Sequence, residues 1–171
     1  MEMKKDGFTL IEIMVVVVIL GMIAVIGSGA FFSILRGSTK TKTLQIVKQN
    51  GDYAISVMER MIRNARELAD PSESSIVSSI TIKNPDGGIT TFSCESDSEP
   101  PTIASNGASL LSSEVRVSDV ECNIFEVTQG QKGIRPPIVK INFKLSPAVT
   151  SSRPEDQAEV NFQTTVTLRN Y

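Results

Sequence analysis

The residue most out of place in this sequence is the acidic Glu12. It stands directly before an apolar run from Ile13 to Leu35, which holds 23 residues without a charge. As a helix this run would measure about 34 Å, enough to cross a bilayer core of about 30 Å. A carboxylate placed in lipid costs on the order of 2.5 kcal/mol. We therefore expect Glu12 to have a cationic partner or a specific purpose at the start of a membrane-spanning helix.

The residues around Glu12 are arranged as in a known processing site. Lys4 and Lys5 precede Gly7, and the sequence from Gly7 to Glu12 reads Gly-Phe-Thr-Leu-Ile-Glu. This segment resembles the processing site of type IV prepilins and type II secretion pseudopilins. The resemblance implies cleavage between Gly7 and Phe8 by a prepilin peptidase and N-methylation of the new first residue, Phe8. It also implies that Glu12 pairs with the amino group of Phe8 on a neighbouring subunit, which a poorly solvated amine and carboxylate both favour.

The resemblance further implies a non-enzymatic filament subunit, more similar to minor pilins and J-type pseudopilins than to a major pilin. Its expected partners are other pilins, the prepilin peptidase, a membrane platform protein, an assembly ATPase and, before assembly, membrane lipid. The expected location is the bacterial inner membrane, crossed once with the head outside the cytoplasm, and then the pilus or pseudopilus. An alternative function is a pilus-tip adhesin or DNA-uptake module on the same anchor.

Two other interpretations of the first thirty-five residues remain open. A basic start, an apolar core at 13–26 and the small residues Ser28, Gly29 and Ala30 also fit a secretory signal peptide. A plain single-pass anchor is the second. Neither accounts for the joint presence of Gly7, Phe8 and Glu12 at this spacing, which the prepilin interpretation uses in full.

Beyond the apolar run, the pattern predicts that the helix continues on an amphipathic face. Apolar or small residues recur at alternating spacings of three and four, as on one side of a helix, and Pro71 supplies a stop. The resemblance implies a leader at 1–7 and a membrane or filament-core half of the helix at 8–35. The pattern along the rest of the chain predicts an amphipathic half of the helix at 36–69 and a β-rich head at 70–171. The stripe consists of Leu44, Val47, Gly51, Ala54, Met58, Ile62, Ala65 and Leu68.

After residue 69 the composition changes to Ser, Thr, Val and Ile with turns rich in Pro, Gly, Asn and Asp. Residues 80–82 and 89–94 flank a turn at 84–88, which predicts a hairpin. Residues 95–109 read as an exposed loop, and 115–127 as two short strands or a bulged one. Alternating apolar residues at 139–145 and 158–168 predict half-buried strands. The expected fold class is α+β, with a mostly antiparallel sheet covering the amphipathic part of the helix.

Charge is unevenly distributed along the chain. Residues 36–70 carry seven Lys and Arg against four Asp and Glu, whereas 71–171 carry eight against twelve. Fields this modest do not indicate a nucleic-acid binder, although a basic stripe could face acidic neighbours in an assembly. Lys4 and Lys5 on one side of the apolar run oppose several cations on the other, so the positive-inside rule does not decide the orientation.

Residue types argue against catalysis. The chain has no histidine, which excludes His-based triads and His metal ligands, and it has no P-loop or dinucleotide signature. No cofactor and no metal site is expected, and Glu95, Asp97 and Glu99 are interpreted as a solvated acidic loop. Cys94 and Cys122 both fall in phase with apolar neighbours, so they form either buried free thiols or, outside the cytoplasm, a disulfide.

Overall fold

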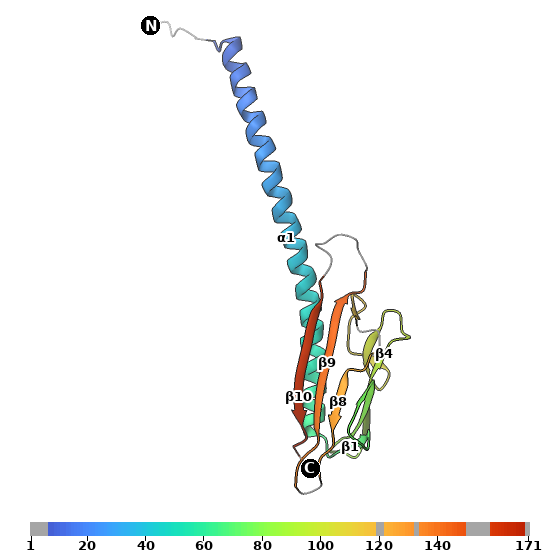
Figure 1. The fold of residues 1–171 in the computed structure, drawn as a ribbon. Coiled ribbons are helices and arrows are strands. Elements are labelled where there is room, and N and C mark those ends of the chain that lie inside the picture. Colours follow the sequence, from blue (N-terminus) through green and yellow to red (C-terminus); the bar gives the residue numbers. More distant parts are fainter. Residues whose placement is uncertain (1–6, 119–121, 132–133, 150–157, 170–171) are drawn as a thin grey trace. The chain divides into compact units, whose positions relative to one another are not determined.

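In the described part of the chain, one long helix is followed by ten short strands (Figure 1). This computed structural model describes residues 7–118, 122–131, 134–149 and 158–169. It divides into two compact units, Met1–Thr39 and Lys40–Tyr171. The elements are α1 (Leu10–Asn64), β1 (Glu67–Asp70), β2 (Ser75–Val77), β3 (Ser79–Lys83), β4 (Ile89–Glu95), β5 (Thr102–Ser105), β6 (Ala108–Ser109), β7 (Val115–Val117), β8 (Phe125–Thr128), β9 (Ile138–Pro147) and β10 (Val160–Thr167).

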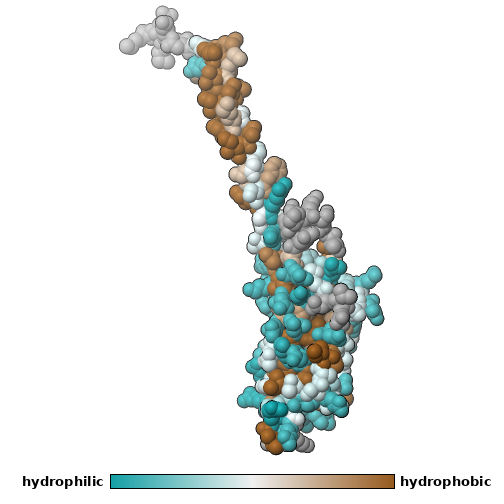
Figure 2. Space-filling model, viewed as in Figure 1, coloured by the Kyte–Doolittle hydropathy of each residue, from teal (hydrophilic) through white to brown (hydrophobic). Residues whose placement is uncertain are grey.

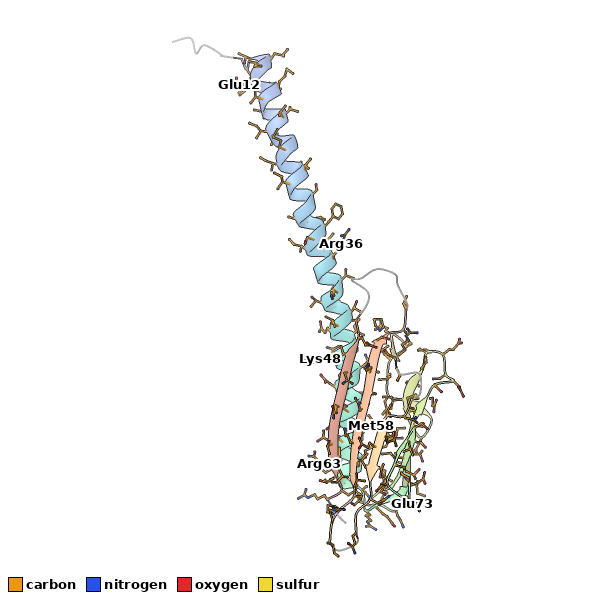
Figure 3. All side chains as sticks on the ribbon, in the orientation of Figure 1. Glu12, Arg36, Lys48, Met58, Arg63 and Glu73 are labelled. Carbon is orange, nitrogen blue, oxygen red and sulfur yellow. A yellow bond between two sulfur atoms is a disulfide. The ribbon has the colours of Figure 1, made fainter. Side chains whose placement is uncertain are left out.

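The predicted amphipathic stripe is confirmed in the second unit. Five residues of α1 are buried there, at spacings of three and four, and Figure 3 labels Met58 among them. Burying each large side chain of the stripe contributes about 1.5–3 kcal/mol relative to exposure. Leu44 is 37% exposed, so the buried stripe begins one turn later than predicted. The buried members of α1 are Val47, Gly51, Ala54, Met58 and Ile62.

The prediction that the helix continues to residue 69 is wrong. Helix α1 ends at Asn64, and residues 67–70 form strand β1, in which Leu68 lies opposite Ile82 of β3. Leu68 suits both arrangements, because its spacing of three residues from Ala65 fits a helix face and its alternation fits a strand. In the strand that forms, it is buried. The main chain decides the outcome, since the amide of Arg66 donates to the carbonyl of Lys83 at 2.8 Å. Pro71 therefore follows a strand rather than a helix.

The strands form two antiparallel sheets. One has the order β1-β3-β4-β5-β6, and the other has the order β10-β9-β8-β2 with β7 also paired to β9. Every residue of β10 pairs with β9 in an unbroken register from Val160 opposite Leu145 to Thr167 opposite Ile138. The inward residues of both sheets and the stripe of α1 share one hydrophobic core. This arrangement confirms the predicted α+β class, with two sheets in place of one.

Gly51 lets β10 approach α1 closely. The ring of Phe162 lies where a Cβ atom at position 51 would be, so only glycine fits there. The ring also stacks on Phe143 of β9, with centroids 5.5 Å apart and planes at 22°. A polar contact adds to this packing, since the Oδ1 of Asn50 accepts from the amide of Ser112 at 2.8 Å. These contacts fix this part of α1 against β10 and against the segment before β7.

The predicted hairpin is confirmed as β3 and β4, with Ile80 opposite Phe92 and a turn at 84–88. Gly87 adopts a φ of +89°, which the turn requires and glycine supplies. Two short strands, β7 and β8, account for the β-prone segment at 115–127, and both pair with β9.

The predicted loop at 95–109 is wrong over its second half. Residues 102–105 form β5, with Ile103 and Ala104 fully buried, and 108–109 form β6. The connection is Asn106-Gly107, whose φ angles of +50° and +78° are those of a tight two-residue turn. Asn-Gly between apolar segments is a strong hairpin signal. The high content of Ser, Pro and acidic residues before it had obscured that signal.

Candidate processing and assembly segment

The chain enters its helix through Thr9. The carbonyl of Thr9 accepts hydrogen bonds from the amides of Glu12 and Ile13 at 3.1 and 3.3 Å, and its Oγ1 accepts from the amide of Glu12 at 3.4 Å. Thr9 is therefore the N-cap of α1, and Glu12 is the third residue of the first turn. A Thr followed three residues later by Glu is the sequence signature of a capping box. This local role of Thr9 and Glu12 was not predicted from the sequence, although their spacing marks it.

The cap leaves Gly7 and Phe8 outside the helix. Neither residue has helical structure, and the side chain of Phe8 is 79% exposed. A peptide bond in an exposed segment without regular structure is the kind of substrate that a peptidase can reach. The Gly7–Phe8 bond is thus accessible in the first unit.

Glu12 lies in the first turn of α1, where Figure 3 labels it. A carboxylate at the N-terminus of a helix is favoured by the helix dipole. Among the described residues no cation forms an ion pair with Glu12, whose side chain is exposed. Within one chain, the acidic group is held at a defined helix position and left open to a partner.

The helix residues that follow Glu12 are apolar on every side. Residues 7–42 are all exposed, and the most apolar 18-residue window of α1 has a mean hydropathy of 2.9 with none of it buried. Figure 2 shows the hydrophobic residues of this part of α1 as a brown surface. The hydroxyl of Ser28 donates to the carbonyl of Ala24 at 2.7 Å, so this polar group has a hydrogen-bond partner within the helix. Length and composition suit this part of α1 to a membrane or to a packed bundle of helices.

One comparison with known proteins bears on this segment. The family model described as the prokaryotic N-terminal methylation motif matches residues 3–28. The motif indicates a type IV pilin-like prepilin. No curated protein and no solved structure matches the chain.

The match to this motif indicates a general function for the segment. It indicates a substrate of prepilin peptidase that assembles with other pilins, and it favours a structural subunit over an enzyme. Together with the apolar part of α1, it is consistent with anchoring in a membrane. Gly7 and Phe8 precede α1 and Glu12 lies in its first turn, whereas Lys4 and Lys5 lie outside the described residues.

The second unit carries the two cysteines of the chain as a pair. Cys94 of β4 and Cys122, which precedes β8, form a disulfide with Cα atoms 5.5 Å apart. Both side chains are buried, and Cys122 adopts a φ of +52°. The bond joins the two sheets, because β4 belongs to one and β8 to the other. Of the two states left open by the sequence, the structure contains the disulfide.

The acidic loop that contains Asp97 and Glu99 lies beside Arg116. Two polar hollows of about 550 and 630 Å³ share the lining residues Ser96, Pro101 and Arg116, and the larger also reaches Asp97 and Glu99. The Nε of Arg116 donates to the Oγ of Ser146 at 3.3 Å. Within the described part of the chain, no three Asp, Glu, Cys or His side chains gather as metal ligands would. These hollows are mixed in charge and assign no cofactor.

Proposed function

We propose that this prepilin is a structural subunit of a type IV pilus or a type II secretion pseudopilus, in the manner of a minor pilin or pseudopilin. In this proposal the leader 1–7 is removed between Gly7 and Phe8, and Phe8 becomes the N-methylated first residue. The apolar part of α1 first spans the inner membrane once, with the head outside the cytoplasm. It later packs among the helices of a filament, with a platform protein and an assembly ATPase as partners.

The observation that carries the proposal is the position of Glu12. The Thr9 cap fixes it in the first turn of α1, directly before the uncharged run that begins at Ile13. After cleavage, the amine of Phe8 would be the nearest group of opposite charge, on this chain or on the next. A poorly solvated ion pair of this kind is costly to break, because each partner left alone is a desolvated charge. Pairing between subunits would therefore set the register of helices in the filament.

The alternative of a tip adhesin or DNA-uptake module receives less support. Single-stranded nucleic acids are commonly bound by exposed aromatic side chains beside cations. In the described part of the second unit, Tyr53 of α1 is the one aromatic side chain classed as exposed, at 57%. The phenylalanines Phe92, Phe125, Phe143 and Phe162 are in the core.

Two substitutions test the proposal in cells that contain the processing and assembly machinery. Mass spectrometry of the recovered protein should give a chain that begins at methylated Phe8, and Gly7→Arg should leave the leader attached. Glu12→Gln, which keeps the size but removes the charge, should be inserted and processed yet fail to enter filaments, whereas Glu12→Asp keeps the charge as a matched control. A chain recovered from wild-type cells that starts at Met1, or beyond Ala30, would refute the proposal. Normal filament entry of Glu12→Gln would refute the pairing role alone.

A further inference from the structure

Thr9 is the residue at which α1 starts. Its carbonyl accepts from the amide of Ile13 at 3.3 Å, as the first four-residue bond of a helix does, and its Oγ1 accepts from the amide of Glu12. The two residues before it, Gly7 and Phe8, have no helical structure and are exposed. An N-cap hydroxyl stabilises one helix start over neighbouring ones, because it accepts from an amide that would otherwise lack a partner. The Thr9 hydroxyl therefore favours a helix that begins after Phe8.

The sequence offers earlier helix starts with which this cap competes. Asp6 and Gly7 are both of residue types that occur as N-caps. A helix that began at either residue would include Phe8 in its first turn, and the carbonyl of Gly7 would accept from the amide of Ile11. The bond between Gly7 and Phe8 would then lie inside a helix, with its carbonyl oxygen engaged. The cap at Thr9 thus keeps the bond proposed for cleavage outside the helix.

The neighbouring residues favour the start at Thr9 over the earlier ones. For a start at Asp6, Gly7 would lie within the helix, where glycine is the least favourable residue apart from proline. For a start at Gly7, Leu10 would take the third helical position, at which a Glu completes a capping box. A start at Thr9 places Glu12 in that position instead. Nothing lies within 4 Å of the place of a Cβ atom at residue 7, so local packing does not account for its glycine.

We propose that Thr9 is a positioning residue for prepilin processing, because its cap holds the Gly7–Phe8 bond in the non-helical form that the peptidase binds. This inference rests on the proposed function, which supplies the cleavage site. A chain whose helix began earlier would have to unwind its first turn before it could bind. Apparent affinity falls in proportion to the fraction of a protein in the competent form. Loss of the cap should therefore raise the KM of cleavage and leave kcat unchanged, since kcat is reached when all of the peptidase is occupied.

The experiment measures cleavage of the full chain in detergent micelles by a purified prepilin peptidase, with kcat and KM determined separately. Thr9→Val keeps the shape of the side chain but removes the hydroxyl. Because loss of an N-cap shifts a helix start by about fivefold, this variant should raise KM by up to about fivefold at constant kcat. Thr9→Ser and Thr9→Asn, whose side chains also cap helices, should keep the KM of the wild type. Carbon-13 chemical shifts of Gly7 and Phe8 should move towards helical values in Thr9→Val but not in the other two variants.

A matched control makes the same change of residue type far from the start of the helix. The Oγ1 of Thr39 donates to the carbonyl of Leu35 at 3.1 Å, and Thr39→Val should leave KM unchanged. A Thr9→Val chain with the KM of the wild type, or with a lower kcat at constant KM, would overturn the proposal. So would an equal rise of KM in Thr9→Val and Thr9→Asn, or a rise without the change in chemical shifts, because the peptidase would then contact the Thr9 side chain directly. A wild-type chain that the peptidase does not cleave after Gly7 would refute the proposed function itself, and this inference with it.

Discussion

The close approach between Gly51 and Phe162 gives the most demanding test of how the helix packs in the head. In Gly51→Ala, the new methyl group would overlap the ring of Phe162, which is buried and stacks on Phe143. Overpacking of this kind costs about 1–3 kcal/mol, and overlap with a buried aromatic ring places the cost near the upper value. Alanine recovers about 1 kcal/mol of helix propensity. We expect a net loss of about 2 kcal/mol in the free energy of unfolding of the head.

The measurement is urea unfolding of the full chain in detergent micelles, followed by circular dichroism. Gly37→Ala is the matched control, because nothing lies within 4 Å of its added methyl group and the helix gain should appear alone. Phe162→Leu should cost stability in the wild type but relieve the overlap in Gly51→Ala, so the two changes should be non-additive. A Gly51→Ala protein as stable as the wild type, or additive effects of the two changes, would refute the packing described here.

Three further predictions concern the polar and covalent ties of the head. Alkylation of the unreduced protein should label neither Cys94 nor Cys122, as read by mass spectrometry, and two labelled thiols would contradict the disulfide. Changing both cysteines to Ser should lower the free energy of unfolding by about 3.5 kcal/mol, because the bond closes a loop of about 29 residues. Asn50→Ala should lower the free energy of unfolding in urea by about 1 kcal/mol, because the amide of Ser112 loses its acceptor. Asn50→Asp keeps that acceptor and should lower the free energy less. Equal losses in the two variants would argue against the contact. Asn106→Ala should lower the free energy of unfolding by about 1–2 kcal/mol, because the residue has a φ of +50° and its Oδ1 accepts from the amide of Thr91 at 2.8 Å. Asn106→Gly should lose only the hydrogen bond, because glycine adopts a positive φ without strain. A Gly variant less stable than the Ala variant would be inconsistent with the strained turn.

The long periodic patterns could be predicted from the sequence because a single cause, burial of one face of a regular helix or strand, produces them. The stripe from Val47 to Ile62 repeats with the helix period, and β9 and β10 alternate with the strand period, so each pattern survives one ambiguous residue. The hairpin of β3 and β4 was predictable from its turn residues. These signals are local, and the fold agrees with them.

The errors occurred where two periods or two signals competed. Leu68 fits both a helix face and a strand, and only the pairing with β3, distant in sequence, decides between them. Ile103 and Ala104 were hidden in a polar segment, although the Asn106-Gly107 turn marked a hairpin. The division into two sheets depends on which strands become neighbours, which no single segment encodes. The residues proposed for processing, Gly7 and Phe8, and for assembly, Glu12, could be predicted from the sequence because the proposal depends on their type and spacing along the chain.

The contact between Phe162 and Gly51 also has a consequence for biosynthesis. The two residues are 111 positions apart in the sequence, so the groove of the helix stays uncovered until almost all of the head has been made. Contacts of such high sequence separation form late, because a long loop must close before they can contribute. A partly translated chain would expose an apolar stripe of the kind that aggregates or recruits chaperones. Export and folding of the head are therefore expected to finish in one late cooperative step, triggered when β10 emerges.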